Sequence, residues 1–80
     1  MLRMSAQTHK GRDDVIGKAI SFFGLGGIGL RVTLKATDHV RFEGGGGYVT
    51  INAAPRGSEV EVTAVTQEWE MDVRRFLGQV

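Results

Sequence analysis

The chain has 80 residues, of which 41% are hydrophobic and 24% charged, and this is the composition of one globular domain. Its net charge of +1 provides no global field that would attract nucleic acid or anionic lipid, so neither is expected as a partner. It has no cysteine, which disfavours a disulfide-stapled secreted protein and favours a cytoplasmic location. No uncharged stretch is longer than residues 19–30, which fall short of the roughly 20 residues of a membrane-spanning helix, so no membrane span is expected.

The N-terminal part of the chain predicts one strand and one helix. Residues 1–10 alternate weakly between apolar and polar side chains, which fits either an edge strand or a frayed tail. Asp13 and Asp14 then open a helix, because acidic side chains suit the N-terminal end of the helix dipole. Gly24 is the natural C′ residue of this helix. Its apolar face consists of Val15, Ile16, Ala19, Ile20, Phe22 and Phe23.

Three hairpins follow, and their registers can be derived because residues directly opposite in a hairpin share a face of the sheet. The first hairpin is predicted to turn over residues 37–39. The second turns at Gly45 and Gly46, which tolerate the positive φ of a type I′ turn. The third turns over residues 55–58, where Pro55 and Gly57 suit a type I turn. The predicted pairs are Leu34–Phe42, Ala36–Val40, Glu43–Tyr48, Phe42–Val49, Val40–Ile51, Ala53–Val60, Ile51–Val62, Val49–Ala64 and Tyr48–Val65.

A final helix is predicted to start at Thr66 as N-cap and to lie across the inner face of the sheet. Its apolar stripe is Trp69, Val73, Phe76, Leu77 and Val80, which makes Trp69 a core residue. The sequence therefore predicts an α+β fold in one domain, residues 1–80. An antiparallel sheet of about five strands, in the order β-α-β-β-β-β-α, carries both helices on one face.

The order of these elements resembles a known superfamily. An acidic helix opening after a first strand, a meander, and a last strand that runs almost directly into a tryptophan-bearing helix are similar to the START-type helix-grip (SRPBCC-like) superfamily. The resemblance is carried by residues 8–15 and 62–69. Polyketide cyclases and lipid carriers belong to this superfamily, and the TATA-binding-protein-like fold shares the minimal topology. The resemblance implies a ligand cavity between the sheet and the last helix, but it carries over no active-site residue.

Two apparent motifs have simpler interpretations. Residues 24–29 match the G-x-G-x-x-G dinucleotide fingerprint, but here a helix precedes the glycines and a strand follows them, the reverse of what phosphate binding needs. We expect a helix-to-strand connection with Leu25 and Ile28 against the core. His39 and Glu43 share the outer face of the sheet, but Arg41 lies between them, so an ion-pair cluster is expected there instead of a metal site.

No constellation of residues supports catalysis, because neither Ser21 nor Ser58 has a derivable histidine partner. We therefore expect a non-enzymatic protein with no catalytic residue, no cofactor and no metal. The first candidate function is a binding or protein-interaction module, with a homodimer or another protein as partner. Its predicted outer interaction face consists of Arg31, Lys35, Arg41, Tyr48, Glu61 and Val65. The alternative is a carrier of a small apolar ligand bound by Phe22, Phe42, Trp69, Val73 and Phe76.

Overall fold

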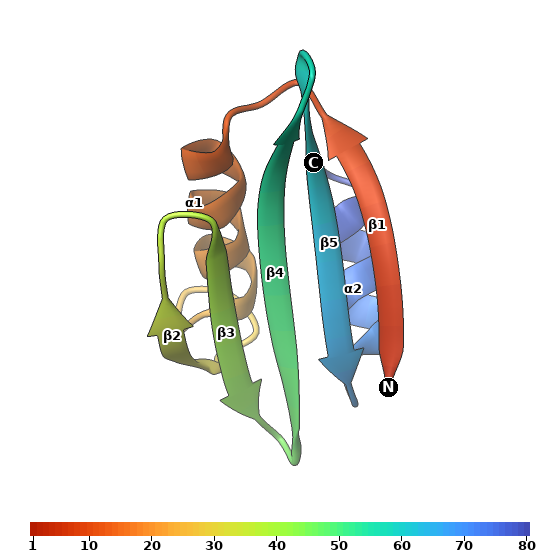
Figure 1. Ribbon diagram of the computed structural model, residues 1–80. Coiled ribbons are helices and arrows are strands. Elements are labelled where there is room, and N and C mark those ends of the chain that lie inside the picture. The colour runs from red at the N-terminus through yellow and green to blue at the C-terminus, as the bar shows by residue number, and fades with distance from the viewer.

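The chain, described from residue 1 to residue 80 by a computed structural model, forms one five-stranded antiparallel sheet with two helices on one of its faces (Figure 1). The sheet order β1-β5-β4-β3-β2 leaves β1 and β2 at the two edges. The predicted α+β fold and its order of elements are therefore confirmed, and the N-terminal segment is an ordered edge strand. The elements are β1 (Leu2–Thr8), α1 (Arg12–Phe23), β2 (Arg31–Lys35), β3 (His39–Gly44), β4 (Gly47–Arg56), β5 (Glu59–Gln67) and α2 (Glu70–Leu77).

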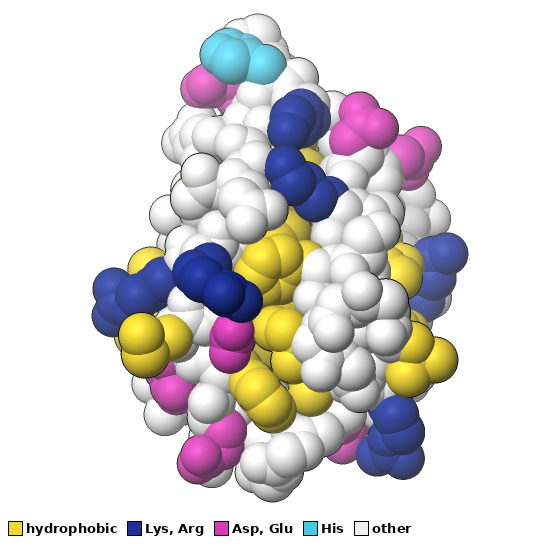
Figure 2. Space-filling view, turned by 180° about the vertical axis from the view of Figure 1, so that it is seen from behind, with side chains coloured by type: hydrophobic (Ala, Val, Ile, Leu, Met, Phe, Trp, Pro, Cys, Tyr) yellow, Lys and Arg dark blue, Asp and Glu magenta, His cyan; other side chains and the backbone are white.

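The core lies between the sheet and the two helices. Helix α1 covers β3 and β4, and helix α2 covers β5 and β1 (Figure 1). Four phenylalanines join the two halves: the ring of Phe23 lies 5.4 Å from the rings of both Phe42 and Phe76, and Phe22 lies 5.7 Å from Phe76. Figure 2 shows the helix-covered face, where a strip of hydrophobic side chains is visible between flanking Lys and Arg side chains. Neither helix has the length and apolar character needed to cross a membrane.

The central hairpin of β3 and β4 has the predicted register. Gly45 and Gly46 form its two-residue turn with φ of 60° and 81°, which glycine adopts without steric cost. The predicted pairs of this hairpin are all present, namely Gly44–Gly47, Glu43–Tyr48, Phe42–Val49 and Val40–Ile51.

The register predicted for the hairpin of β2 and β3 is wrong. The backbone N–H of Ala36 donates to the carbonyl of His39 at 2.8 Å, so the turn contains two residues where three were predicted. Leu34 consequently pairs with Arg41, and a bulge between Val32 and Leu34 brings Val32 opposite Phe42. The shorter turn shifts the pairing by one residue and would turn every side chain of β2 to the other face. The extra residue of the bulge restores the predicted facing from Val32 back to the start of the strand.

The hairpin of β4 and β5 also turns more tightly than predicted. Only two residues separate the strands, and Gly57 takes a φ of 63°. Ala53 therefore pairs with Val62, two residues away from its predicted partner Val60. A shift of two residues keeps each side chain on its predicted face but changes every cross-strand pair. Val65, for example, pairs with Thr50 and not with Tyr48. Pro55 is tolerated inside β4 because β3 extends only to the pair with Asn52, leaving this end of β4 without a second strand neighbour.

The last helix starts later than predicted. Thr66 lies inside β5, where its hydroxyl donates to the carbonyl of Tyr48 at 2.7 Å, so it is not available as an N-cap. The chain leaves the strand through Glu68, whose φ is 81°, and Trp69 occupies the N-cap position. Trp69 is partly buried against the core, and its indole Nε1 donates to the carbonyl of Gly44 at 3.0 Å. This contact ties the start of α2 to the central hairpin.

Candidate functional site

The largest cavity of the molecule lies beside the edge strand β2. It has a volume of about 770 Å³ and opens between the end of α1, the glycine-rich connection and the start of β2. We call it the β2 cavity. A volume of this size falls within the ~300–1,000 Å³ range of small-molecule and side-chain pockets. Its lining consists of Ile20, Ser21, Gly24, Leu25, Gly26, Leu30, Arg31 and Val32.

The glycine-rich connection forms one wall of the β2 cavity by folding back onto the end of α1. The backbone N–H of Ile28 donates to the carbonyl of Phe22 at 3.0 Å, and that of Leu30 donates to the carbonyl of Phe23 at 2.8 Å. Gly27 must lack a side chain, because a Cβ there would lie 2.1 Å from the carbonyl oxygen of Phe22. These backbone N–H groups bond to carbonyls at the end of α1 and so satisfy the last turn of the helix. The glycines of the G-x-G-x-x-G match therefore allow the chain to end the helix and pack closely against it.

Two details of this connection differ from prediction. Gly24 follows the helix with a φ of −77°, outside the left-handed region expected of a C′ glycine. It is required instead by space, because a Cβ would lie 2.5 Å from the carbonyl oxygen of Ile20. Ile28 packs against the core as predicted, whereas Leu25 is 89% exposed at the mouth of the cavity.

Strand β2 is exposed along its whole length. Val32 is 43% exposed and Leu34 is 49% exposed, which is unusual for two apolar residues of one short strand. The bulge directs them to opposite faces, because Val32 pairs with the inward Phe42 and lines the β2 cavity, whereas Leu34 pairs with the outward Arg41. As β2 is a sheet edge, the backbone groups on its outer side have no strand neighbour.

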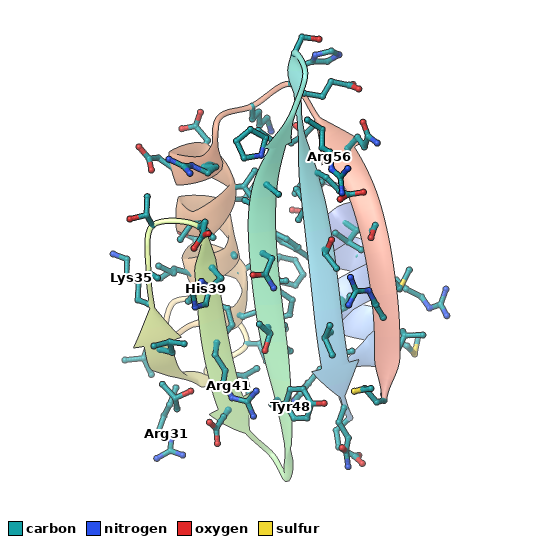
Figure 3. The ribbon with its side chains drawn as sticks, in the orientation of Figure 1. Arg31, Lys35, His39, Arg41, Tyr48 and Arg56 are labelled. Carbon is teal, nitrogen blue, oxygen red and sulfur yellow. The ribbon has the colours of Figure 1, made fainter.

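Two cations mark the ends of β2, and neither belongs to any of the five ion pairs of the structure. Arg31 lines the β2 cavity and also a polar hollow on the outer face. Lys35 borders a smaller hollow of about 320 Å³ on the helix side, together with Asp13 of α1. The prediction that Lys35 shares the outer face with Arg31 is therefore wrong, because the bulge changes the facing of the strand. Figure 3 shows both side chains at the β2 margin of the sheet.

Most charged side chains on the outer face of the sheet pair with one another. Arg41 Nε donates to Glu43 Oε2 at 3.1 Å, and its guanidinium lies 4.4 Å from the ring centre of Tyr48 (Figure 3). Arg56 likewise contacts Glu61 at 3.1 Å. The hydrogen bond from Arg41 lowers the pKa of Glu43, with a smaller contribution from the charge of Arg31. Cations and anions therefore pair with one another both at the β3 side and at the β5 side of this face.

His39 has a different partner from the one considered in the sequence. Its Nδ1 lies 2.8 Å from Asp38 Oδ1, and this contact lowers the pKa of Asp38. Glu43 is held by Arg41, as the expected ion-pair cluster requires. The structure therefore keeps His39 and Glu43 in separate interactions.

The five residues predicted to bind an apolar ligand line none of the three cavities. Phe42, Val73 and Phe76 are fully buried between the sheet and the helices, with Phe42 against Phe23 of α1 and Phe76 against both Phe22 and Phe23. Phe22 packs on Phe76 and lies under the guanidinium of Arg75 at 5.4 Å. The structure thus provides no cavity under α2, because aromatic side chains occupy the position where the helix-grip resemblance implies a ligand.

No family model, no curated protein and no solved structure matches this chain. The helix-grip resemblance accordingly stays a prediction.

Sequence reasoning missed most of the β2 cavity. The sequence assigns Ile20 and Gly24 to the first helix and its end, Leu25 to the core and Arg31 to an interaction face, but it assigns none of them to a cavity. The available signal was the apolar character of Leu25 and Val32 in a segment that contains few other core residues. That signal could not be read without the bulge, which decides the face on which Val32 lies.

Proposed function

We propose that the chain is a non-enzymatic protein-interaction module, acting in the cytoplasm, that binds an extended segment of a partner protein along β2. The observation that carries this proposal is the placement of a wholly exposed edge strand directly beside the apolar β2 cavity. An edge strand offers main-chain hydrogen bonds to an added strand, and a neighbouring pocket selects one of its side chains.

The charges of the site indicate the chemistry of that segment. Arg31 and Lys35 lie at opposite ends of β2 without ion-pair partners, so acidic residues in the bound segment would meet them. Ile20, Leu30 and Val32 in the cavity wall favour an apolar side chain between those acidic positions. The expected partner segment is therefore extended, apolar at its centre and acidic at its ends.

The bulge supplies a matched pair of variants that tests this proposal. Val32→Asp places a charge in the cavity wall, whereas Leu34→Asp places the same charge on the opposite face of the same strand. The probe is a short blocked peptide of Val and Leu with Asp at both ends, and the control peptide has Lys at both ends. In an NMR titration, we expect the acidic peptide, and not the control peptide, to change the amide chemical shifts of β2. These changes should be absent in Val32→Asp and present in Leu34→Asp.

A second candidate function is a carrier of a small apolar ligand, with the ligand in the β2 cavity and not under α2. The β2 cavity has the volume for a small apolar ligand, whereas buried side chains fill the core under α2. Mass spectrometry of the purified protein under non-denaturing conditions separates the two functions. A copurifying apolar molecule in a one-to-one ratio, absent from Val32→Asp, would favour the carrier over the interaction module.

A further inference from the structure

The opposite edge of the sheet has a surface that suits a second copy of this chain. β1 pairs with β5 through seven consecutive residue pairs, from Leu2–Thr66 to Thr8–Val60, with no irregularity of register. No strand lies on its other side. Long regular edge strands with unpaired backbone groups are the usual sites of strand pairing between chains. We propose that two copies associate through β1 and form one continuous antiparallel sheet.

The regularity of β1 favours self-pairing there, and the bulge opposes it at β2. A two-fold axis through Ser5 sets Arg3 of one copy opposite Gln7 of the other, and Arg3 is the single charged residue of β1. The equivalent axis through the middle of β2 would pass through the bulge, where the ladder of backbone groups is irregular. The same chain therefore disfavours its own copy at one edge and accepts it at the other.

Helix α2 adds a second layer to this interface. It lies over β5 and β1 (Figure 1), and a two-fold axis perpendicular to the sheet keeps both copies of α2 on the same face. Helices centred between β5 and β1 in each copy would be about two strand spacings apart, or ~10 Å. This is the distance at which helices pack against one another.

The C-terminal turn of α2 lies closest to this axis. α2 starts three residues after the end of β5, beside the Leu2 end of β1, and runs toward the Thr8 end. Ser5 is the middle of β1, so an axis through it lies nearer to the end of α2 than to its start. Arg75 lies over Phe22 and so marks the side facing α1, and at 3.6 residues per turn Leu77 lies on the opposite side. The partly buried Leu77 of each copy therefore faces the other copy.

Charge reversal with rescue tests this interface, and the readout is the dimerisation constant from sedimentation equilibrium. The wild type is expected to dimerise reversibly. Gln7→Arg should weaken dimerisation about tenfold, because it sets a second guanidinium opposite Arg3 in both symmetric contacts. The double variant Arg3→Glu, Gln7→Arg should restore it. Arg31→Glu, on the β2 edge, is the matched control and should leave the constant unchanged.

Circular dichroism of each variant shows that the fold is retained, since Arg3, Gln7 and Arg31 are exposed. A wild type that stays monomeric at millimolar concentration would overturn the proposal. So would dimerisation that Gln7→Arg leaves intact, a double variant that does not recover, or a dimer that dissociates on Arg31→Glu.

Discussion

The two edges of the sheet differ although they belong to one sheet and flank the same core. β1 runs for seven residues in an unbroken register beneath α2, whereas β2 has five residues, a bulge and an open cavity beside it. Bulges and positive charge are devices by which proteins keep an edge strand from pairing with its own copy. β2 has a bulge and a cation at each end, whereas β1 has no bulge and a single cation, Arg3. We therefore propose different partners for the two edges, a copy at β1 and a foreign acidic segment at β2.

The largest effect is expected at the aromatic cluster that both edges share. Phe76 is fully buried on α2 and contacts Phe22 and Phe23 of α1, so it joins the helix over β1 to the helix near β2. Phe76→Ala should cost about 3–5 kcal/mol, enough to unfold so small a domain. Urea unfolding followed by circular dichroism measures this. If the variant stayed folded and lost only one edge function, the two halves would be less coupled than the structure indicates.

An intermediate effect is expected at the central turn, which fixes the strands between the two edges. Gly45 and Gly46 both have positive φ, but a Cβ on Gly45 would lie 2.5 Å from Cζ2 of Trp69, whereas a Cβ on Gly46 would meet nothing within 4 Å. Gly46→Ala should therefore cost about 1 kcal/mol from backbone strain alone. Gly45→Ala should cost at least about 1 kcal/mol more, because the indole must also move.

Thermal unfolding of the two single variants and of Gly45→Ala in a Trp69→Phe background measures the difference. The excess cost at Gly45 should shrink when the smaller ring replaces the indole. Equal costs at both glycines would show that Trp69 does not rest on the turn.

How far the sequence predicted the molecule depended on how strongly each turn was specified. The adjacent Gly45 and Gly46 permit a type I′ turn, and the register of β3 and β4 followed correctly from it. At residues 37–39 and 55–58 two turn lengths were compatible with the local residues, and the shorter turn forms in each case. In the hairpin of β4 and β5 the register shifts by two residues, so the predicted inward residues still face inward. In the hairpin of β2 and β3 it shifts by one residue, and a bulge restores the inward facing of Val32.

The candidate site lies where this uncertainty was greatest. Inward residues of the central strands were predicted because alternation alone assigns their face. Val32 and Lys35 could not be placed, since their facing depends on a bulge that no residue of β2 signals. The start of α2 was missed for a related reason, because the chain turns through a positive φ at Glu68, a residue type that gives no warning of it.

The smallest effect concerns how firmly β2 is attached to the centre of the sheet. Arg41 holds Glu43 by a hydrogen bond, and Arg31 of β2 acts on the same carboxylate through its charge. Carboxyl NMR titration should show a pKa for Glu43 below its ordinary value, raised strongly by Arg41→Ala and only slightly by Arg31→Ala. A larger change with Arg31→Ala would mean that Arg31 is committed to Glu43 and is not free for a partner segment.

The sign of the accompanying pH effect follows from that shift. Because the folded-state pKa of Glu43 is lowered, its contribution to stability is present above the unfolded value of about 4.5 and is lost as the pH falls through the folded-state pKa. The contribution is small, since the carboxylate is exposed to solvent. Arg41→Ala should therefore flatten the acid limb of the stability curve and lower the stability above pH 5 only slightly.

The most direct test of the difference between the edges is amide hydrogen exchange, resolved by residue, at low and high protein concentration and with the acidic peptide. We predict that raising the protein concentration protects amides of β1 and leaves β2 unchanged, while the peptide protects β2 and leaves β1 unchanged. Concentration-dependent protection on β2, or peptide-dependent protection on β1, would contradict it.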